Sequence, residues 1–341
     1  MGILSWFARG KRDRESEARV DARVTDALAR IIRLDPQLRL VEKYEARMGV
    51  VLATCIGYVE SLVMALPEPR GASAQAWSSD PFIHAFFATP GDVASVLSRS
   101  AELRACFEQN PDLAHVHAVL SMAMYERRVL GVAWVGEHAR PDVAQTTVSF
   151  NDHRIRICAR TDGELREEIV LRAVDQLVLN GMQGVANDAS KREVLEEERA
   201  LLKARLQLLE RQGAGMRAMI GSDEAPDVGE VARLQARIEE NSQNLASLGL
   251  PMDLLDRKFE HVRVVLAAPE AHLHVEVKRL RLDRMNVVME PTSTQPGDEI
   301  EFRLARIPGS SPETRTFSLV RVARTDLLPE RTMLHQAARL I

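Results

Sequence analysis

The chain of 341 residues is short of aromatic side chains, cysteines and net charge. Aromatic residues make up 4% of it, which disfavours a protein that stacks nucleic-acid bases on aromatic rings. The three cysteines, Cys55, Cys106 and Cys158, lie far apart and form no CxxC pair. Their spacing excludes a dense disulfide framework and predicts a reducing, cytoplasmic compartment. The formal net charge is −4, whereas a protein that binds nucleic acid through its phosphates usually carries an excess of positive charge. We therefore expect no nucleic-acid partner.

Motifs of the common enzyme classes are absent as well. The sequence contains no GxxxxGKS/T loop, no GxGxxG fingerprint, no GxSxG elbow and no HExxH pair. These patterns serve to hold phosphates, dinucleotides, a serine nucleophile and zinc, respectively. We therefore predict no cofactor and no catalytic residue, and our interpretation leans towards a non-enzymatic protein. Apolar residues still make up 45% of the chain, which is enough for a packed core.

The hydrophobic pattern predicts an α+β protein. Periodicities of 3.6 and 2 residues alternate along the chain in blocks, and loops rich in proline and glycine separate them. The predicted segments are residues 1–14, a candidate amphipathic membrane-surface segment; 15–182, helices with a three-stranded antiparallel meander; 186–249, a coiled-coil helical hairpin; 257–328, a small antiparallel β-barrel or sandwich; and 329–341, a C-terminal helix.

Local signals place the elements of the first large segment. Asp80 and Thr89 each precede a proline and are expected to cap helices. Leu113–Tyr125 is predicted as a short helix, and Asn151-Asp152 as a hairpin turn, because both turn residues tolerate a positive φ. Asn180-Gly181 is expected to end the helix that precedes it. The strands of the meander are predicted at residues 129–135, 144–150 and 154–159.

The longest apolar run is Gly49–Leu66. Its length is near the minimum for a membrane span, about 17–18 residues. A carboxylate, Glu60, lies inside it and is costly at bilayer depth. We favour a buried central helix over a membrane span, and both interpretations stay open.

Residues 186–249 contain the spacing of a coiled coil. Leucines recur every seven residues in the first half, and apolar residues step by three and four in the second half, with one asparagine among them. Such an asparagine tends to fix register or partner number. The predicted seam consists of Leu195, Leu202, Leu209, Val231, Leu234, Ile238, Asn241, Leu245 and Leu248.

The last large segment contains about five predicted strands. Leu273, Val275 and Val277 are odd-numbered, whereas Leu280 and Leu282 are even-numbered, so we predict a β-bulge near residues 278–279 that helps the strands to curl into a barrel. The strands are predicted at His261–Leu266, His272–Leu282, Met285–Met289, Ile300–Ile307 and Arg315–Val322.

Two candidate ligand sites fall in this segment. Arg279, Arg281 and Arg284 lie close together in sequence and could bind an anion such as a phosphorylated nucleotide. The turn and strand at Pro296–Phe302 resemble the later strands of PilZ-type barrels, and this resemblance implies a cyclic-dinucleotide ligand. The RxxxR and D/NxSxxG motifs of that family are not found in register, so no ligand residue is carried over. A weak metal candidate is His272, His274 and Glu276, since alternate residues of a strand share a face.

The N-terminus carries apolar and aromatic residues followed by cations, as an interfacial membrane anchor does. The candidate anchor residues are Ile3, Leu4, Trp6, Phe7, Arg9, Lys11 and Arg12. Together these observations predict a cytoplasmic, non-enzymatic scaffold or adaptor, peripheral at the inner membrane face if the anchor acts. It would self-associate or recruit a helical partner through its coiled coil. The alternative is a sensor whose C-terminal β-domain binds an anionic ligand.

Overall fold

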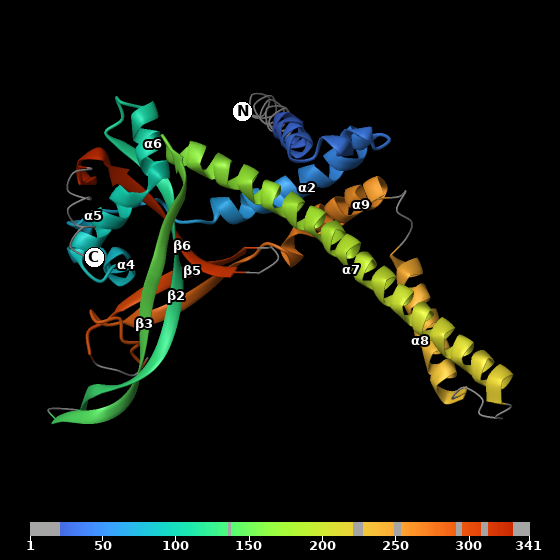
Figure 1. Ribbon diagram of the computed structural model, residues 1–341. Coiled ribbons are helices and arrows are strands. Elements are labelled where there is room, and N and C mark those ends of the chain that lie inside the picture. The colour runs from blue at the N-terminus through green and yellow to red at the C-terminus, as the bar shows by residue number, and fades with distance from the viewer. Residues whose placement is uncertain are drawn as a thin grey trace, which may run out of the picture. The chain divides into compact units, whose positions relative to one another are not determined.

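The computed structural model describes residues 21–135, 138–220, 228–248, 254–290, 295–307 and 313–329 (Figure 1). In these residues the fold is α+β, with N-terminal helices, three long helices and one six-stranded sheet that is not closed into a barrel. The long helices are α7 (Asp162–Ile220), α8 (Val228–Ser247) and α9 (Leu254–Ala267). The chain forms two compact units. The first comprises Met1–Ala27, Leu52–Leu177 and Ala268–Ile341, and the second comprises Leu28–Val51 and Val178–Ala267.

The first unit is built on the sheet, whose strands lie in the order β3-β2-β6-β5-β4. Neighbours in this order run antiparallel, and the short strand β1 adds to β6 in parallel. Because β2 pairs with β6 only over its first eight residues, β2 and β3 continue as a two-stranded ribbon (Figure 1). The strands are β1 (Arg70–Gly71), β2 (His115–Val135), β3 (His138–Ala159), β4 (Val275–Leu282), β5 (Asp298–Ile307) and β6 (Glu313–Ala323).

Short helices cover one face of the sheet. Asp80 and Thr89 act as N-caps of α4 and α5, as the sequence predicts, because their side chains accept hydrogen bonds from the first backbone N–H groups of these helices. The core between helices and sheet includes Phe86, Phe150 and Phe302. The helices are α3 (Ala76–Ser79), α4 (Pro81–Phe86), α5 (Pro90–Arg99) and α6 (Ala101–Gln109).

Parts of two long helices lie over the opposite face. They are residues 52–64 of α2 (Tyr44–Met64) and residues 162–177 of α7 (Asp162–Ile220). Arg166 of α7 donates hydrogen bonds to carbonyl oxygens at the end of α2, such as that of Val63 at 2.6 Å. The hydroxyl of Tyr58 donates to the carbonyl of Leu273 at 2.9 Å, which joins α2 to the segment before β4.

The predicted C-terminal barrel or sandwich is wrong, because β4, β5 and β6 join β2 and β3 in one sheet. The change of phase in the sequence has another cause. Leu273 and Val275 face α2 and α7, whereas Leu280 and Leu282 face the helices α3–α6. Pairing of β4 with β5 is unbroken from Val275 to Leu282, so there is no bulge at residues 278–279. A sheet covered on both faces carries apolar residues in both phases.

The predicted helix Leu113–Tyr125 is the first half of β2. Its residues Val116, Ala118 and Leu120 are buried in the core, while Val119 faces α2 and α7. Burial on both faces gives a nearly continuous apolar run, which periodicity alone does not distinguish from a buried helix.

The predicted turn at Asn151-Asp152 is a bulge inside β3, so the meander has two strands here instead of three. Asp152 does adopt a positive φ of 51°. However, Arg154 lies opposite Ser121 and Asn151 lies opposite Ala123, so β3 contains an extra residue and continues in the same direction. A positive φ is therefore found at one of the two predicted turn residues, Asp152, where it belongs to a bulge and not to a hairpin turn.

The second unit is helical, and its helix α9 (Leu254–Ala267) contains the predicted strand His261–Leu266. Phe259 of α9 is fully buried, with the ring of Tyr44 edge-on at 6.1 Å and the guanidinium of Arg47 at 4.3 Å from its centroid. The helix α7 also continues past Asn180-Gly181, where the sequence predicts its end.

Gly181 lies in the interior of α7, at the point where α9 crosses this helix closely. The close crossing explains why the position is a glycine. A Cβ atom at this position would come within 2.7 Å of the Val262 Cα and 3.2 Å of the His261 carbonyl oxygen. These are backbone atoms, so the clash cannot be relieved by a rotamer change. The glycine therefore permits a helix crossing and does not cap the helix.

We expect Gly181→Ala to destabilise the second unit by about 1–3 kcal/mol, although alanine is the better helix former. The matched control is Gly57→Ala in α2, where a Cβ would meet nothing within 4 Å and the change should stabilise by about 0.5–1 kcal/mol. Urea unfolding followed by circular dichroism measures the change in the free energy of unfolding for both variants, and the two changes should have opposite signs. A stabilising Gly181→Ala would contradict the close crossing.

The apolar run Gly49–Leu66 forms most of α2. Among the described helices, α2 is long and apolar enough to cross a membrane by length and composition, and 33% of its most apolar window is buried. Glu60 forms an ion pair with Arg23. A buried core helix meets the same criteria, so the two interpretations of this run both stand.

Candidate functional site in the helical hairpin

Two helices of the second unit lie side by side and run in opposite directions. The Arg237 guanidinium bonds to Glu198 at 2.8 Å, and that of Arg205 bonds to Glu230 at 2.6 Å. As residue numbers rise along α7, those of the partners on α8 (Val228–Ser247) fall, which is the signature of an antiparallel pair. We call residues 186–220 and 228–248 the hairpin.

The predicted seam residues lie on the inner side of this hairpin. Three of them on α8, Leu234, Asn241 and Leu245, are buried, and the other six are half-buried: Leu195, Leu202, Leu209, Val231, Ile238 and Leu248. Most residues between them are exposed. The two helices of one chain thus cover each other's seam, and a partner that binds the hairpin must use a different face.

Asn241 is the polar position in this seam and is 4% exposed. Its Nδ2 donates to the carboxylate of Glu198 at 3.4 Å, and within the described residues its Oδ1 has no hydrogen-bond partner. Such a polar group costs stability but favours the one register in which its bond forms.

A second apolar stripe runs along the outer side of α7. Val194, Leu201 and Leu208 are spaced by seven residues and are 60%, 72% and 59% exposed. Seven residues make nearly two helical turns, so the three side chains lie on one line. Exposed leucines are common singly, but a repeat at heptad spacing is the pattern of a helix that packs against another helix.

The charges around this outer stripe are mixed but unevenly placed. Glu196 and Glu197 precede Leu201 and Lys203 and Arg211 follow it, with Arg199 and Glu210 as exceptions. Glu198 and Arg205 bond across the hairpin to α8. An antiparallel second copy centred on Leu201 would place the acidic end of one helix beside the basic end of the other. A parallel copy would place like charges together.

Sequence reasoning missed the outer stripe because the apolar residues come in pairs. Val194-Leu195, Leu201-Leu202 and Leu208-Leu209 repeat every seven residues, and the first member of each pair faces solvent while the second faces α8. The available signal was this doubling, which widens the apolar arc beyond that of a two-helix seam.

The candidate anion site is engaged within the protein. The Arg279 Nε bonds to Glu301 at 2.6 Å, and the Arg281 Nη2 donates to the Gln295 carbonyl at 2.9 Å. Arg284 is exposed in the turn that follows β4. The first two guanidinium groups therefore serve contacts around β4 and β5.

The weak metal candidate is not assembled on one strand. Glu276 lies in β4, whereas His272 and His274 precede the strand. In the part of the chain that the structure describes, no group of three or more His, Cys, Asp or Glu side chains could hold a metal ion. Burial raises the pKa of Cys55 and of Cys158 to about 12, so both thiols stay protonated at neutral pH and are poor nucleophiles.

The candidate membrane anchor, with Ile3, Leu4, Trp6, Phe7, Arg9, Lys11 and Arg12, lies outside the described residues and stays a prediction. Comparison with protein-family models, with curated proteins and with solved structures finds no match. The function is therefore argued from the site itself.

Proposed function

We propose that this protein is a non-enzymatic scaffold or adaptor of the cytoplasm, and that its hairpin binds a second copy of the chain through the outer stripe Val194, Leu201 and Leu208. The heptad spacing of these exposed residues carries the proposal. A helical partner protein with a matching stripe could occupy the same face. The predicted seam contributes indirectly, because it holds α7 rigid against α8 and so presents the stripe.

The size of the stripe predicts weak association. A symmetric pair would bury six apolar side chains, each worth roughly 1–2 kcal/mol because each is already partly covered. Their sum is roughly 6–12 kcal/mol. Against the low end of the cost of association, about 4 kcal/mol, it leaves about 2–8 kcal/mol in favour of the dimer. The middle of that range corresponds to a dissociation constant on the order of 100 µM, which attachment to a surface or to a larger assembly would strengthen through local concentration.

Sedimentation velocity over a concentration series tests this proposal. The wild-type chain should pass from monomer to dimer as concentration rises through about 100 µM. Leu201→Glu should stay monomeric, because dimerisation would bury two carboxylates without partners. Gln207→Glu is the matched control: it adds the same charge at an exposed position of α7 outside the stripe and should dimerise as the wild type does. A Leu201→Glu variant that still dimerises like the wild type would refute the proposal.

A further inference from the structure

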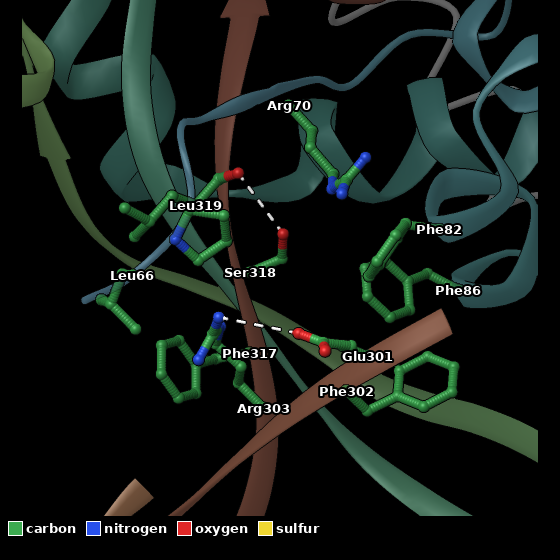
Figure 2. A pocket seen from close by; sticks show the side chains of 11 residues that line it. Leu66, Arg70, Phe82, Phe86, Glu301, Phe302, Arg303, Phe317, Ser318 and Leu319 are labelled. Atoms are coloured by element: carbon green, nitrogen blue, oxygen red, sulfur yellow. Dashed lines mark hydrogen bonds and ion pairs between the residues drawn. The ribbon is translucent and has the colours of Figure 1, made fainter. Parts of the chain in front are cut away.

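An apolar groove lies in the first unit between the sheet and the two long helices. It has a volume of about 370 Å³, within the range of about 300–1,000 Å³ that is usual for small-molecule sites. Leu62 and Val63 of α2, Ile169 and Ala173 of α7, and Phe317 of β6 are among its lining residues. A smaller neighbouring pocket of about 20 Å³ shares Leu66 and Phe317 with it (Figure 2).

The groove is a poor site for water. Most of its lining side chains are aliphatic or aromatic, and a water molecule in a cavity needs two to four polar partners. Several of these side chains, including Leu62, Ile169 and Phe317, are only half-buried, so the helices leave apolar surface of the sheet uncovered. A ligand that fills this space must itself be apolar over most of its length.

The polar groups of the groove are strongly biased in charge. Arg156, Arg172 and Arg315 line it, and none of its described lining residues is acidic. The neighbouring pocket differs, because Glu301 lies in it beside Arg303 (Figure 2). An anionic group is therefore favoured in the groove and a cationic group is disfavoured.

Each of the three arginines has a carboxylate neighbour outside the lining. Arg156 pairs with Glu102 at 3.1 Å and Arg172 with Glu168 at 2.7 Å. Both arginines are exposed, so they stand where the groove opens to solvent. Exposed pairs of this kind hold their partners weakly, and a guanidinium has five N–H donors, so both can bond to a further anion.

Arg315 differs because it is buried, with 4% of its surface exposed. It bonds to the Asp152 carboxylate at 2.8 Å and to the Asp152 carbonyl oxygen at 2.5 Å. The same carboxylate pairs with Arg154 at 2.7 Å. Hydrogen bonds from Arg315 and then Arg154 lower the pKa of Asp152, so at neutral pH this one carboxylate is ionised and bonds to two guanidinium groups.

We propose that this groove binds a single-chain anionic amphiphile, such as a free fatty acid. Its alkyl chain would lie between the sheet and the helices α2 and α7, and its carboxylate would bond to Arg156 and Arg172 at the opening. The inference is independent of self-association, because the groove and the hairpin belong to different units.

Isothermal titration calorimetry of the full chain with dodecanoate, below its micelle-forming concentration, tests this proposal. We expect a single site with a dissociation constant on the order of 10 µM. Dodecanol, which has the same chain and no charge, should bind at least about tenfold more weakly, since it cannot form charge-assisted bonds to the guanidinium groups. Equal affinity for both compounds, or no binding of dodecanoate, would overturn the proposal.

Two variants separate the roles of the chain and the head group. Ala173→Phe should fill the apolar part and weaken binding of dodecanoate by at least about tenfold, with unfolding by urea showing that the protein remains folded. The double variant Arg156→Gln/Arg172→Gln should bind dodecanoate about tenfold more weakly and dodecanol unchanged. Arg128→Gln, an exposed arginine of β2 outside the groove, is the control and should bind as the wild type. If Ala173→Phe binds with wild-type affinity, the ligand lies elsewhere and the assignment of the groove is wrong.

Discussion

Replacing Arg166 with alanine is expected to lower the free energy of unfolding of the first unit by about 3–5 kcal/mol. This side chain is 13% exposed and bonds to three carbonyl oxygens at the end of α2: those of Val63 at 2.6 Å, Leu66 at 3.2 Å and Pro67 at 2.9 Å. It also pairs with Asp162 at 2.8 Å. The last carbonyl groups of a helix have no partner within the helix, so the variant would leave them, and Asp162, without Arg166 as a donor.

The measurement is urea unfolding followed by tryptophan fluorescence. Trp77 packs against the core of the first unit, so its fluorescence reports on the unfolding of that unit. Arg172→Ala is the matched control on the same helix, because its single pair with Glu168 is exposed and should contribute less than about 1 kcal/mol. Equal effects of the two changes would show that Arg166 does not join α2 to α7.

Phe302→Ala is expected to be equally severe, at about 3–5 kcal/mol. Phe302 is 1% exposed and lies at the centre of an aromatic cluster on the α3–α6 side of the sheet. Its ring centroid is 5.2 Å from that of Phe150, 6.0 Å from that of Phe86 and 6.4 Å from that of Phe82. Truncation would leave a cavity and would remove aromatic contacts with two helix residues and one strand residue.

The same fluorescence assay measures this loss, with Met285→Ala as the control. Met285 is 80% exposed, and its truncation should change stability by less than about 0.5 kcal/mol. Phe302→Leu should fall between the two, because it keeps most of the apolar volume and loses the ring contacts. A loss below about 1 kcal/mol for Phe302→Ala would mean that these rings do not hold the helices to the sheet.

The elements that could be predicted are those whose signals are local. The helix starts at Asp80 and Thr89 depend on one side chain and the next few backbone N–H groups, so the sequence alone reveals them. Elements set by distant contacts were mispredicted. Gly181 was interpreted as a helix end because the actual need for a glycine arises from the backbone of α9, where the Val262 Cα would lie 2.7 Å from a Cβ at this position. That contact comes from a segment distant in the sequence.

The strands show the same limit. The alternation of one strand does not reveal whether its second face meets water or another layer. The change from odd-numbered apolar residues to the even-numbered Leu280 and Leu282 was therefore interpreted as a bulge. In the structure the two sets face different layers of helices, one on each side of the sheet. The groove could not be predicted at all, because it is lined by α2, α7 and five strands, which come from distant parts of the sequence.

The outer stripe lies between these cases. Its seven-residue spacing is visible in the sequence, but only the packing of α8 against Leu195 and Leu202 shows which member of each apolar pair is covered. Val194 and Leu201 could be recognised as surface residues only after the hairpin partner had been placed.

Disulfide trapping at position 201 tests the proposed pairing of two copies most directly. In the antiparallel dimer centred on Leu201, this residue lies near the two-fold axis, opposite its own copy. Under mild oxidation at about 100 µM protein, Leu201→Cys should form a covalent dimer rapidly, whereas Leu202→Cys, which faces α8, and the wild-type chain should not. If Leu201→Cys is trapped no faster than these two, the outer stripe does not join copies of this protein.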